Sequence, residues 1–141
     1  MSATKSLEAR IAELEAREAI KELSAQYAWH VARAEGALMA DLFTIDGVFH
    51  STGTGHKIEG REKLREYYPT VMTPGDTIPM VLNHIIRIDG TTAEGTLKMQ
   101  SPWHGTKKGF VGYYEDKYRV EDGKWKIAYR KWFFHRQPEA A

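Results

Sequence analysis

The chain has 141 residues, of which 42% are hydrophobic and 28% charged, and its formal net charge is +1. This length suits one domain, the near-neutral charge disfavours nucleic acid as a partner, and the absence of cysteine excludes disulfides and thiolate chemistry. No apolar run reaches the roughly 20 residues that span a bilayer, and the N-terminus has no signal-peptide pattern, so we expect a cytoplasmic protein without membrane contact.

The first third of the sequence carries a helical pattern of apolar residues in two consecutive segments. Their apolar stripes consist of Leu7, Ile11 and Leu14, and of Ile20, Leu23, Tyr27 and Val31. Spacings of three and four residues place each stripe on one helix face, and a charged stretch separates the two segments. The first segment is charged around most of its circumference, which is typical of a helix that lies across a domain or against a second subunit.

The middle of the chain predicts short elements separated by turns. Residues 38–43 favour one or two further helical turns, and the stretch 44–47 breaks the pattern before a strand over 48–51. Residues 61–68 predict a short helix. Pro69 is expected to end it, because proline disfavours helix in the residue before it and lacks the backbone N–H that continues the hydrogen-bond ladder.

The second half of the chain predicts strands. One runs over 81–88 and a second over 92–100, and the stretch 101–109 then interrupts the sheet before a long hairpin over 112–131. The Asp-Gly pair at 122–123 gives this hairpin its turn, since a type I′ turn needs positive φ at both central residues.

Helices come first and strands last in this order. Such segregation indicates an α+β fold, with the helices packed on one face of a curved antiparallel sheet. We find no internal repeat, low-complexity tract or linker. We therefore expect one domain over residues 1–137, followed by a short tail at 138–141.

Several stretches together resemble the SnoaL-like branch of the NTF2-like superfamily, whose relatives include scytalone dehydratase, bile-acid 7-dehydratase and ketosteroid isomerase. The resembling stretches are residues 17–27, 42–43, 46–49, 60–64, 83–84 and 114–127. Each is short, but their order and spacing extend over nearly the whole chain. The resemblance implies an NTF2-like cone, in which N-terminal helices pack on a strongly curved antiparallel sheet and enclose a mostly apolar pocket for a small hydrophobic substrate.

The resemblance also implies a set of acid–base residues. Dehydratases of this group use a strand histidine as base, tyrosines as hydrogen-bond donors, and an aspartate one turn beyond the helix tyrosine. Here His84 matches the histidine and Tyr27 matches the helix tyrosine, while His50 falls where scytalone dehydratase places a second tyrosine. The aspartate position is occupied by Ala32, which cannot orient a histidine, so His30 or His50 is left as a substitute.

The residue pattern makes His84 and Tyr27 candidates without the resemblance. By strand alternation His84 shares its face with three aliphatic residues, including Leu82, so burial is expected to keep its imidazole neutral near pH 7. A core histidine satisfied by one hydrogen bond explains the same pattern. Tyr27 lies on the second apolar stripe, where its hydroxyl either bonds a backbone carbonyl or donates to a substrate oxygen as negative charge develops.

The remaining substrate-binding candidates are His30, Met99, Trp103, His104 and Tyr114. Trp103 and His104 interrupt a strand at a place where a bulge could turn a side chain inward, and a surface loop anchored by the tryptophan fits equally. By strand alternation Tyr114 shares a face with Gly112, Asp116 and Tyr118, and the glycine either leaves space for a ligand or relieves crowding. His50 is a second acid, base or donor if it faces the interior, and otherwise lies exposed at the mouth of the cone.

We therefore predict a cofactor-independent lyase that uses acid–base catalysis on a hydroxylated aromatic or polycyclic small molecule, by dehydration or by C–C cleavage that releases a small aldehyde. A ketosteroid-isomerase-like isomerase, a polyketide cyclase, and a non-catalytic hydrophobic-ligand-binding or assembly protein remain as alternatives, because this fold hosts all of them. Without a His-Glu-x-x-His pattern, paired carboxylates or a nucleotide loop, we expect no metal and no cofactor. The resemblance implies a homodimer or homotrimer.

Overall fold

The computed structural model describes residues 4–135. Within this range the elements are α1 (Leu7–Arg33), α2 (Gly36–Ala40), β1 (Phe43–Ser51), β2 (Lys57–Glu59), α3 (Arg61–Val71), β3 (Met80–Asp89), β4 (Thr92–Ser101), β5 (Phe110–Glu121) and β6 (Lys124–Phe134). The predicted domain end at residue 137 and the tail at 138–141 lie outside the described residues. Among the described helices, none is long and apolar enough to cross a membrane.

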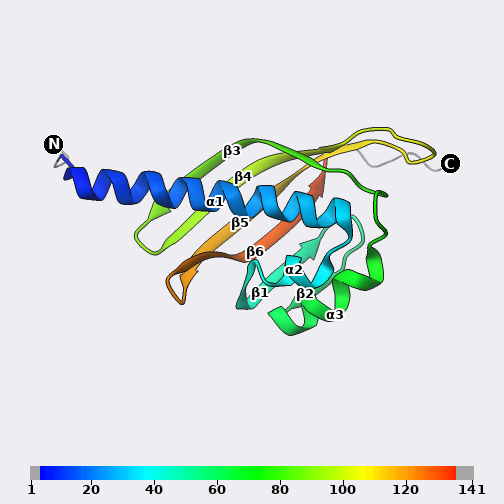
Figure 1. Ribbon diagram of the computed structural model, residues 1–141, viewed down its shortest axis with the longest axis horizontal. Coiled ribbons are helices and arrows are strands. Elements are labelled where there is room, and N and C mark those ends of the chain that lie inside the picture. Colours follow the sequence, from blue (N-terminus) through cyan, green and yellow to red (C-terminus); the bar gives the residue numbers. More distant parts are fainter. Residues whose placement is uncertain (1–3, 136–141) are drawn as a thin grey trace.

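The strands form one sheet in the order β2-β1-β6-β5-β4-β3, with the helices on one of its faces (Figure 1). The long helix α1 runs over the strands from β3 to β6, while α2 and α3 cover the end near β1 and β2 (Figure 1). The expected α+β class, with helices packed on a curved sheet, is confirmed. The sheet is mixed, however, because β1 and β6 are parallel while all other neighbours are antiparallel. A long connection between two strands allows either direction, and no local sequence pattern indicates this pairing.

One continuous helix, α1, replaces the two predicted segments. The charged residues 15–18 are mostly strong helix formers, so the helix passes through them without a break. At its start, the hydroxyl of Ser6 accepts a hydrogen bond from the backbone N–H of Ala9 at 3.1 Å. Arg17 donates to the carbonyl oxygen of Ile86 at 2.6 Å, which ties the helix to β3. The second apolar stripe packs on the sheet, and the first stays exposed.

Two predicted boundaries are wrong. β1 begins at Phe43, before the predicted start at Val48, because Phe43 is fully buried and pairs with β6. The turn signal at 44–47 marks an irregularity in that pairing, not the end of a helix. Likewise α3 continues through Pro69 to Val71. Proline removes one backbone hydrogen bond there, two residues before the helix ends, and α2 packs closely against this turn, where a Cβ at Gly36 would lie 2.8 Å from the Pro69 nitrogen.

Two β-bulges change which side chains face the helices. In β3, Asn83 and His84 together lie opposite the single residue Leu97 of β4, and Asn83 adopts a left-handed conformation with φ 53°. In β6, Ala128 is the extra residue opposite β5. An inserted residue shifts the alternation by one, so the residues beyond each bulge face the side opposite to the one that strict alternation predicts.

The hydrophobic core lies between the helices and the sheet. Its almost fully buried members include Ile20, Met39, Phe43, Leu64, Leu97 and Ile127. Several polar side chains also lie buried within this core, among them Ser24, Asp116 and Arg130.

Candidate active site

A buried ion pair lies at the centre of the interior. Asp116 of β5 and Arg130 of β6 each have side chains that are 0% exposed. The guanidinium of Arg130 donates twice to the Asp116 carboxylate, from Nε to Oδ1 at 3.0 Å and from Nη2 to Oδ2 at 2.7 Å. Charges taken out of water require such paired, two-point contacts, because the ion pair alone does not offset the cost of desolvation.

Aromatic rings and a helix hydroxyl complete the surroundings of Arg130. Its Cζ lies 4.5 Å from the ring centre of Tyr27 and 4.3 Å from that of Tyr114, and its Nη2 also donates to the Ser24 hydroxyl at 3.0 Å. Burial alone would lower the pKa of Arg130, but the charge of Asp116 raises it, so the guanidinium stays charged. Its Nη1 has no hydrogen-bond partner among residues 4–135.

A chain of hydrogen bonds connects this ion pair to His84. The Tyr118 hydroxyl donates to Oδ2 of Asp116 at 2.6 Å, and Nε2 of His84 lies 2.9 Å from the same hydroxyl oxygen. The pKa of His84 is lowered to about 4, chiefly by burial; the charge of Asp116 opposes this shift, and the positive charges of Arg130 and Lys21 add to it. The imidazole is therefore neutral at pH 7, as the sequence pattern predicted.

Tyr27 borders the same network from the helix side. Its hydroxyl lies 3.1 Å from the hydroxyl of Tyr68, and burial raises the pKa of both groups, so both stay protonated. Tyr27 packs edge-on against Tyr114, with ring centres 5.9 Å apart. His84 and Tyr27 thus belong to one interior region, connected through Tyr118, Asp116 and Arg130, although they do not touch each other directly.

The bulge in β3 explains how His84 comes to face the interior. Asn83 takes up the extra residue with its positive φ, a conformation that asparagine tolerates better than most side chains. After the bulge, His84 and Ile86 face the helices. Leu82 lies before the bulge and is 43% exposed, so the expectation that it shares the face of His84 is wrong.

Arg130 is an interior residue that the sequence pattern does not predict. Strict alternation from the buried Ile127 would point Arg130 to the outside, but the extra residue Ala128 turns it inward. Asp116 had been placed on the face of Tyr114, and that alternation holds because β5 has no extra residue between them. The sequence pattern therefore predicted the inward orientation of Asp116 but not that of Arg130.

His50 does not join this network. Phe49 and Arg130 lie opposite each other in the β1–β6 pairing and face the helices, so the neighbouring His50 faces the outer side of the sheet. There its Nδ1 lies 3.2 Å from the Tyr129 hydroxyl. The expectation that His50 assists His84 is corrected by this orientation. The parallel pairing of β1 with β6 fixes the orientation of His50, and no local sequence pattern predicts this pairing.

Three other candidates also lie apart from His84. Near the end of α1, Nδ1 of His30 is 3.2 Å from the Glu35 carboxylate. Trp103 is 68% exposed in the β4–β5 connection. His104 follows it there, and its Nε2 lies 2.5 Å from the carbonyl oxygen of Gly75. These contacts favour the surface-loop interpretation for both residues over a position inside the pocket.

Met99 and Tyr114 do face the interior, where they are 5% exposed. The space beside Gly112 that could have held a ligand is occupied by the Trp132 ring, which a Cβ at Gly112 would overlap. Side chains thus fill this part of the interior in the conformation described.

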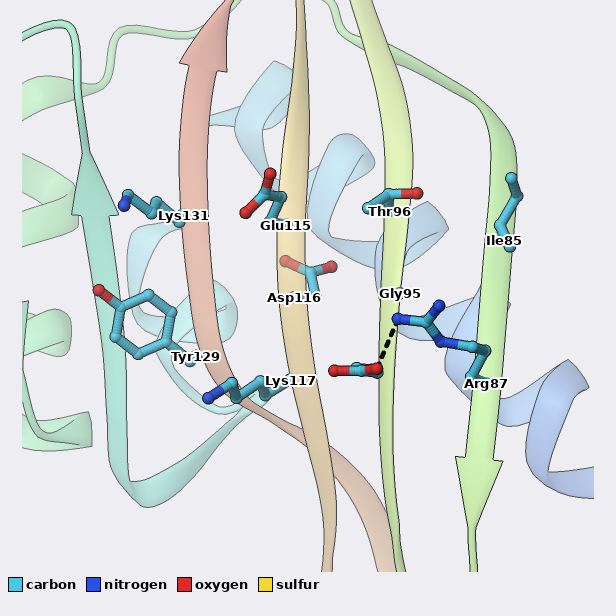
Figure 2. A pocket seen from close by; sticks show the side chains of 10 residues that line it. Ile85, Arg87, Gly95, Thr96, Glu115, Asp116, Lys117, Tyr129 and Lys131 are labelled. Carbon is cyan, nitrogen blue, oxygen red and sulfur yellow. Dashed lines mark hydrogen bonds and ion pairs between the residues drawn. The ribbon is translucent and has the colours of Figure 1, made fainter.

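The outer face of the sheet carries a groove of about 650 Å³ (Figure 2). Figure 2 views the sheet from the side opposite the helices, and most of the labelled side chains lie on this side, whereas the Asp116 carboxylate faces the interior. Charged groups of both signs and a tyrosine line the groove: Arg87, Glu94, Glu115, Lys117, Tyr129 and Lys131. Among the described residues, no group of three or more acidic residues, histidines or cysteines is arranged to hold a metal ion.

Comparisons with solved structures identify the fold. A protein of unknown function from Mycobacterium tuberculosis is 26% identical, with a TM-score of 0.77 over 96% of this chain and 79% of that one. An NTF2-like protein with a cystatin-like fold from Novosphingobium aromaticivorans is 21% identical, with a TM-score of 0.79 over 96% and 92%. A candidate scytalone dehydratase from the same organism is 19% identical, with a TM-score of 0.76 over 88% and 87%.

No curated protein matches the chain. The family model of the SnoaL-like domain matches residues 12–131, which is most of the sequence. The resemblance inferred from the sequence is thereby confirmed, and this chain belongs to the SnoaL-like family.

Proposed function

We propose that this protein is a cofactor-independent lyase that acts on a hydroxylated aromatic or polycyclic small molecule, by dehydration or by C–C cleavage. The observation that carries the proposal is the partly buried imidazole of His84, which faces the interior and has a pKa lowered to about 4. A neutral imidazole is the form that accepts a proton at pH 7. The lowered pKa makes this imidazole a weaker base than a free histidine, while its conjugate acid returns the proton readily to a leaving oxygen.

In the proposed dehydration, His84 removes a proton from the carbon beside the one that carries the hydroxyl group. The electron pair of that C–H bond forms a double bond as the C–O bond breaks, and the leaving oxygen takes the proton back and departs as water. Tyr27 is proposed to donate to the substrate oxygen on which charge develops meanwhile. Tyr27 is 3% exposed, so this contact requires the interior to open around it.

One substrate can separate the two outcomes. The aldol of benzaldehyde and acetone is an aromatic β-hydroxy ketone, whose dehydration gives a conjugated enone and whose C–C cleavage gives benzaldehyde and acetone. Both reactions are followed by ultraviolet absorption and confirmed by chromatography. The purified chain should produce one of these two sets of products faster than buffer does.

Two histidine variants then test the site. We expect His84→Gln to lower the rate by about 10²-fold or more, the range for loss of a general acid–base group. The matched control is His50→Gln, which removes a histidine from the opposite face of the sheet and should leave the rate unchanged. Equal rates for the wild type and His84→Gln would remove His84 from the mechanism.

A second candidate is a non-catalytic protein that binds a hydrophobic molecule or serves in an assembly. The filled interior supports it, because Tyr27, Tyr114 and Trp132 are all almost fully buried. This candidate predicts no turnover across a panel of β-hydroxy ketones of increasing ring number. It also predicts that at least one of them raises the melting temperature.

We also propose that the outer face of the sheet joins copies of the chain into a homodimer or homotrimer. Ile85 is 66% exposed beside the groove, with Leu82 and Val111 exposed by 43% and 44%. Exposed apolar side chains next to charges of both signs suit contact with a second copy. Light scattering should detect the oligomer, and Ile85→Glu should weaken it, whereas Ile45→Glu should not. A monomeric wild type at micromolar concentration would contradict the proposal.

A further inference from the structure

We infer that Asp116, acting through Tyr118, is the positioning group that fixes the tautomer of His84, leaving Nδ1 as the nitrogen that exchanges protons with a substrate. Asp116 on β5 would thus provide the carboxylate that orients the histidine, which Ala32 on the helix cannot do. The inference rests on the proposed function as far as the substrate is concerned. The hydrogen-bond direction on which it depends can be measured without any reaction.

The direction follows from counting hydrogens. A carboxylate paired with a guanidinium only accepts hydrogen bonds, so the contact between Tyr118 and Asp116 uses the single hydrogen of the tyrosine hydroxyl. That oxygen has no second hydrogen to offer His84. The 2.9 Å contact between His84 Nε2 and the Tyr118 oxygen must therefore use a hydrogen on Nε2. In a neutral imidazole, Nδ1 is then the nitrogen with the free lone pair.

The ion pair fixes the hydrogen-bonded series His84–Tyr118–Asp116, here called the relay, to the sheet. Arg130 holds both oxygens of Asp116 and also donates to Ser24 on α1. Asp116 therefore cannot swing away from Tyr118 without breaking buried charge-assisted hydrogen bonds. A carboxylate held so firmly is a fixed acceptor, and the relay transmits its orientation to the imidazole.

The backbone brings the imidazole close to β4. A Cβ added at Gly95 would lie 3.5 Å from Nε2 of His84 and 2.6 Å from the carbonyl oxygen of Ile85. The bulged strand β3 thus lies directly against Gly95, where any side chain would push it away. Glycine at this position keeps Nε2 within reach of the Tyr118 hydroxyl.

The relay positions His84 while adding little net charge beside it. The charged and titratable groups that face the imidazole are Lys21 from α1, Asp116 and Tyr118 from β5, and Arg130 from β6. Arg130 neutralises Asp116, so the pair leaves the imidazole neutral, whereas an unpaired carboxylate at the same place would favour imidazolium. The arrangement orients a base without protonating it.

Nitrogen-15 NMR of the imidazoles in the full-length chain at pH 7 tests the inference. The His84 signals are assigned by their loss in His84→Gln. In the wild type we expect a protonated Nε2 and an unprotonated Nδ1. In Tyr118→Phe, which keeps the ion pair, both nitrogens should move towards the values of freely exchanging tautomers. The matched control is Tyr67→Phe, which removes a hydroxyl that contacts His56 at 3.2 Å and should leave the His84 signals unchanged.

A hydrogen on Nδ1 of His84 in the wild type would overturn the inference, and so would identical His84 signals in the wild type and Tyr118→Phe. Should Tyr118→Phe fail to fold, the wild-type tautomer alone decides. If the aldol substrate is turned over, Tyr118→Phe should lower kcat about tenfold or more at unchanged KM. A fixed His84 tautomer without turnover of any substrate supports the inference about Asp116 and Tyr118 and contradicts the proposed function. Turnover by a protein whose His84 exchanges freely between tautomers supports the proposed function and contradicts the inference.

Discussion

Replacing Asp116 by asparagine should destabilise the protein more than any change to its surface charges. The substitution keeps the shape of the side chain but leaves the fully buried Arg130 without its counter-charge. Two hydrogen bonds from Arg130 and one from Tyr118 end on this carboxylate. The contacts that would remain to Arg130 are the Ser24 hydroxyl and the rings of Tyr27 and Tyr114, and none of them supplies a full negative charge.

The expected loss is about 3–5 kcal/mol, the range for removing one partner of a buried ion pair. That is a large part of the roughly 5–15 kcal/mol by which a domain is stable. The double variant Asp116→Leu/Arg130→Met removes both charges and keeps the volume, so it should be more stable than Asp116→Asn. It retains some deficit, because Tyr118 loses its acceptor. The surface control is Glu94→Gln, which breaks an exposed pair with Arg87 and should cost less than about 1 kcal/mol.

Urea unfolding followed by tryptophan fluorescence measures these free energies, since the chain has four tryptophans and Trp132 lies in the core. Equal slopes with denaturant concentration are needed for the comparison. A loss below about 1 kcal/mol for Asp116→Asn, or a double variant no more stable than the single one, would refute the reasoning.

Two further predictions concern His84 and Gly112. The folded pKa of His84, about 4, lies below its ordinary value of 6.5, so between these values the unfolded chain binds a proton that the folded chain does not. Stability should therefore be complete above pH 6.5 and fall by about 1–2 kcal/mol towards pH 4, allowing for partial exposure. Melting curves should detect a smaller fall in His84→Gln, and an unchanged fall would contradict the assignment. Gly112→Ala should cost about 1–3 kcal/mol in urea unfolding, because its Cβ overlaps the Trp132 ring and the Phe133 carbonyl oxygen. Wild-type stability in Gly112→Ala would contradict this prediction and would mean that the Trp132 ring moves aside at little cost.

Local sequence patterns were sufficient for the elements and the family. The apolar stripe around Tyr27 predicted the buried face of α1, and the Asp-Gly turn at 122–123 predicted the hairpin of β5 and β6. The even alternation of β5 correctly placed Tyr114 and Asp116 on one face. Each of these features depends on residues only a few positions apart in the chain, so the sequence pattern is sufficient to predict it.

Pairing between distant strands decided the rest. One extra residue in β3 turns His84 inward and Leu82 outward, and one in β6 turns Arg130 inward against the alternation set by Ile127. The parallel pairing of β1 with β6 sends His50 to the outer face. The local sequence of a strand does not indicate whether the strand contains a bulge. Its register is fixed only by pairing with the partner strand. The sequence alone therefore determined the fold class and named His84 as a candidate, whereas the tertiary structure decided that His84 faces the interior and which carboxylate and which cation surround it.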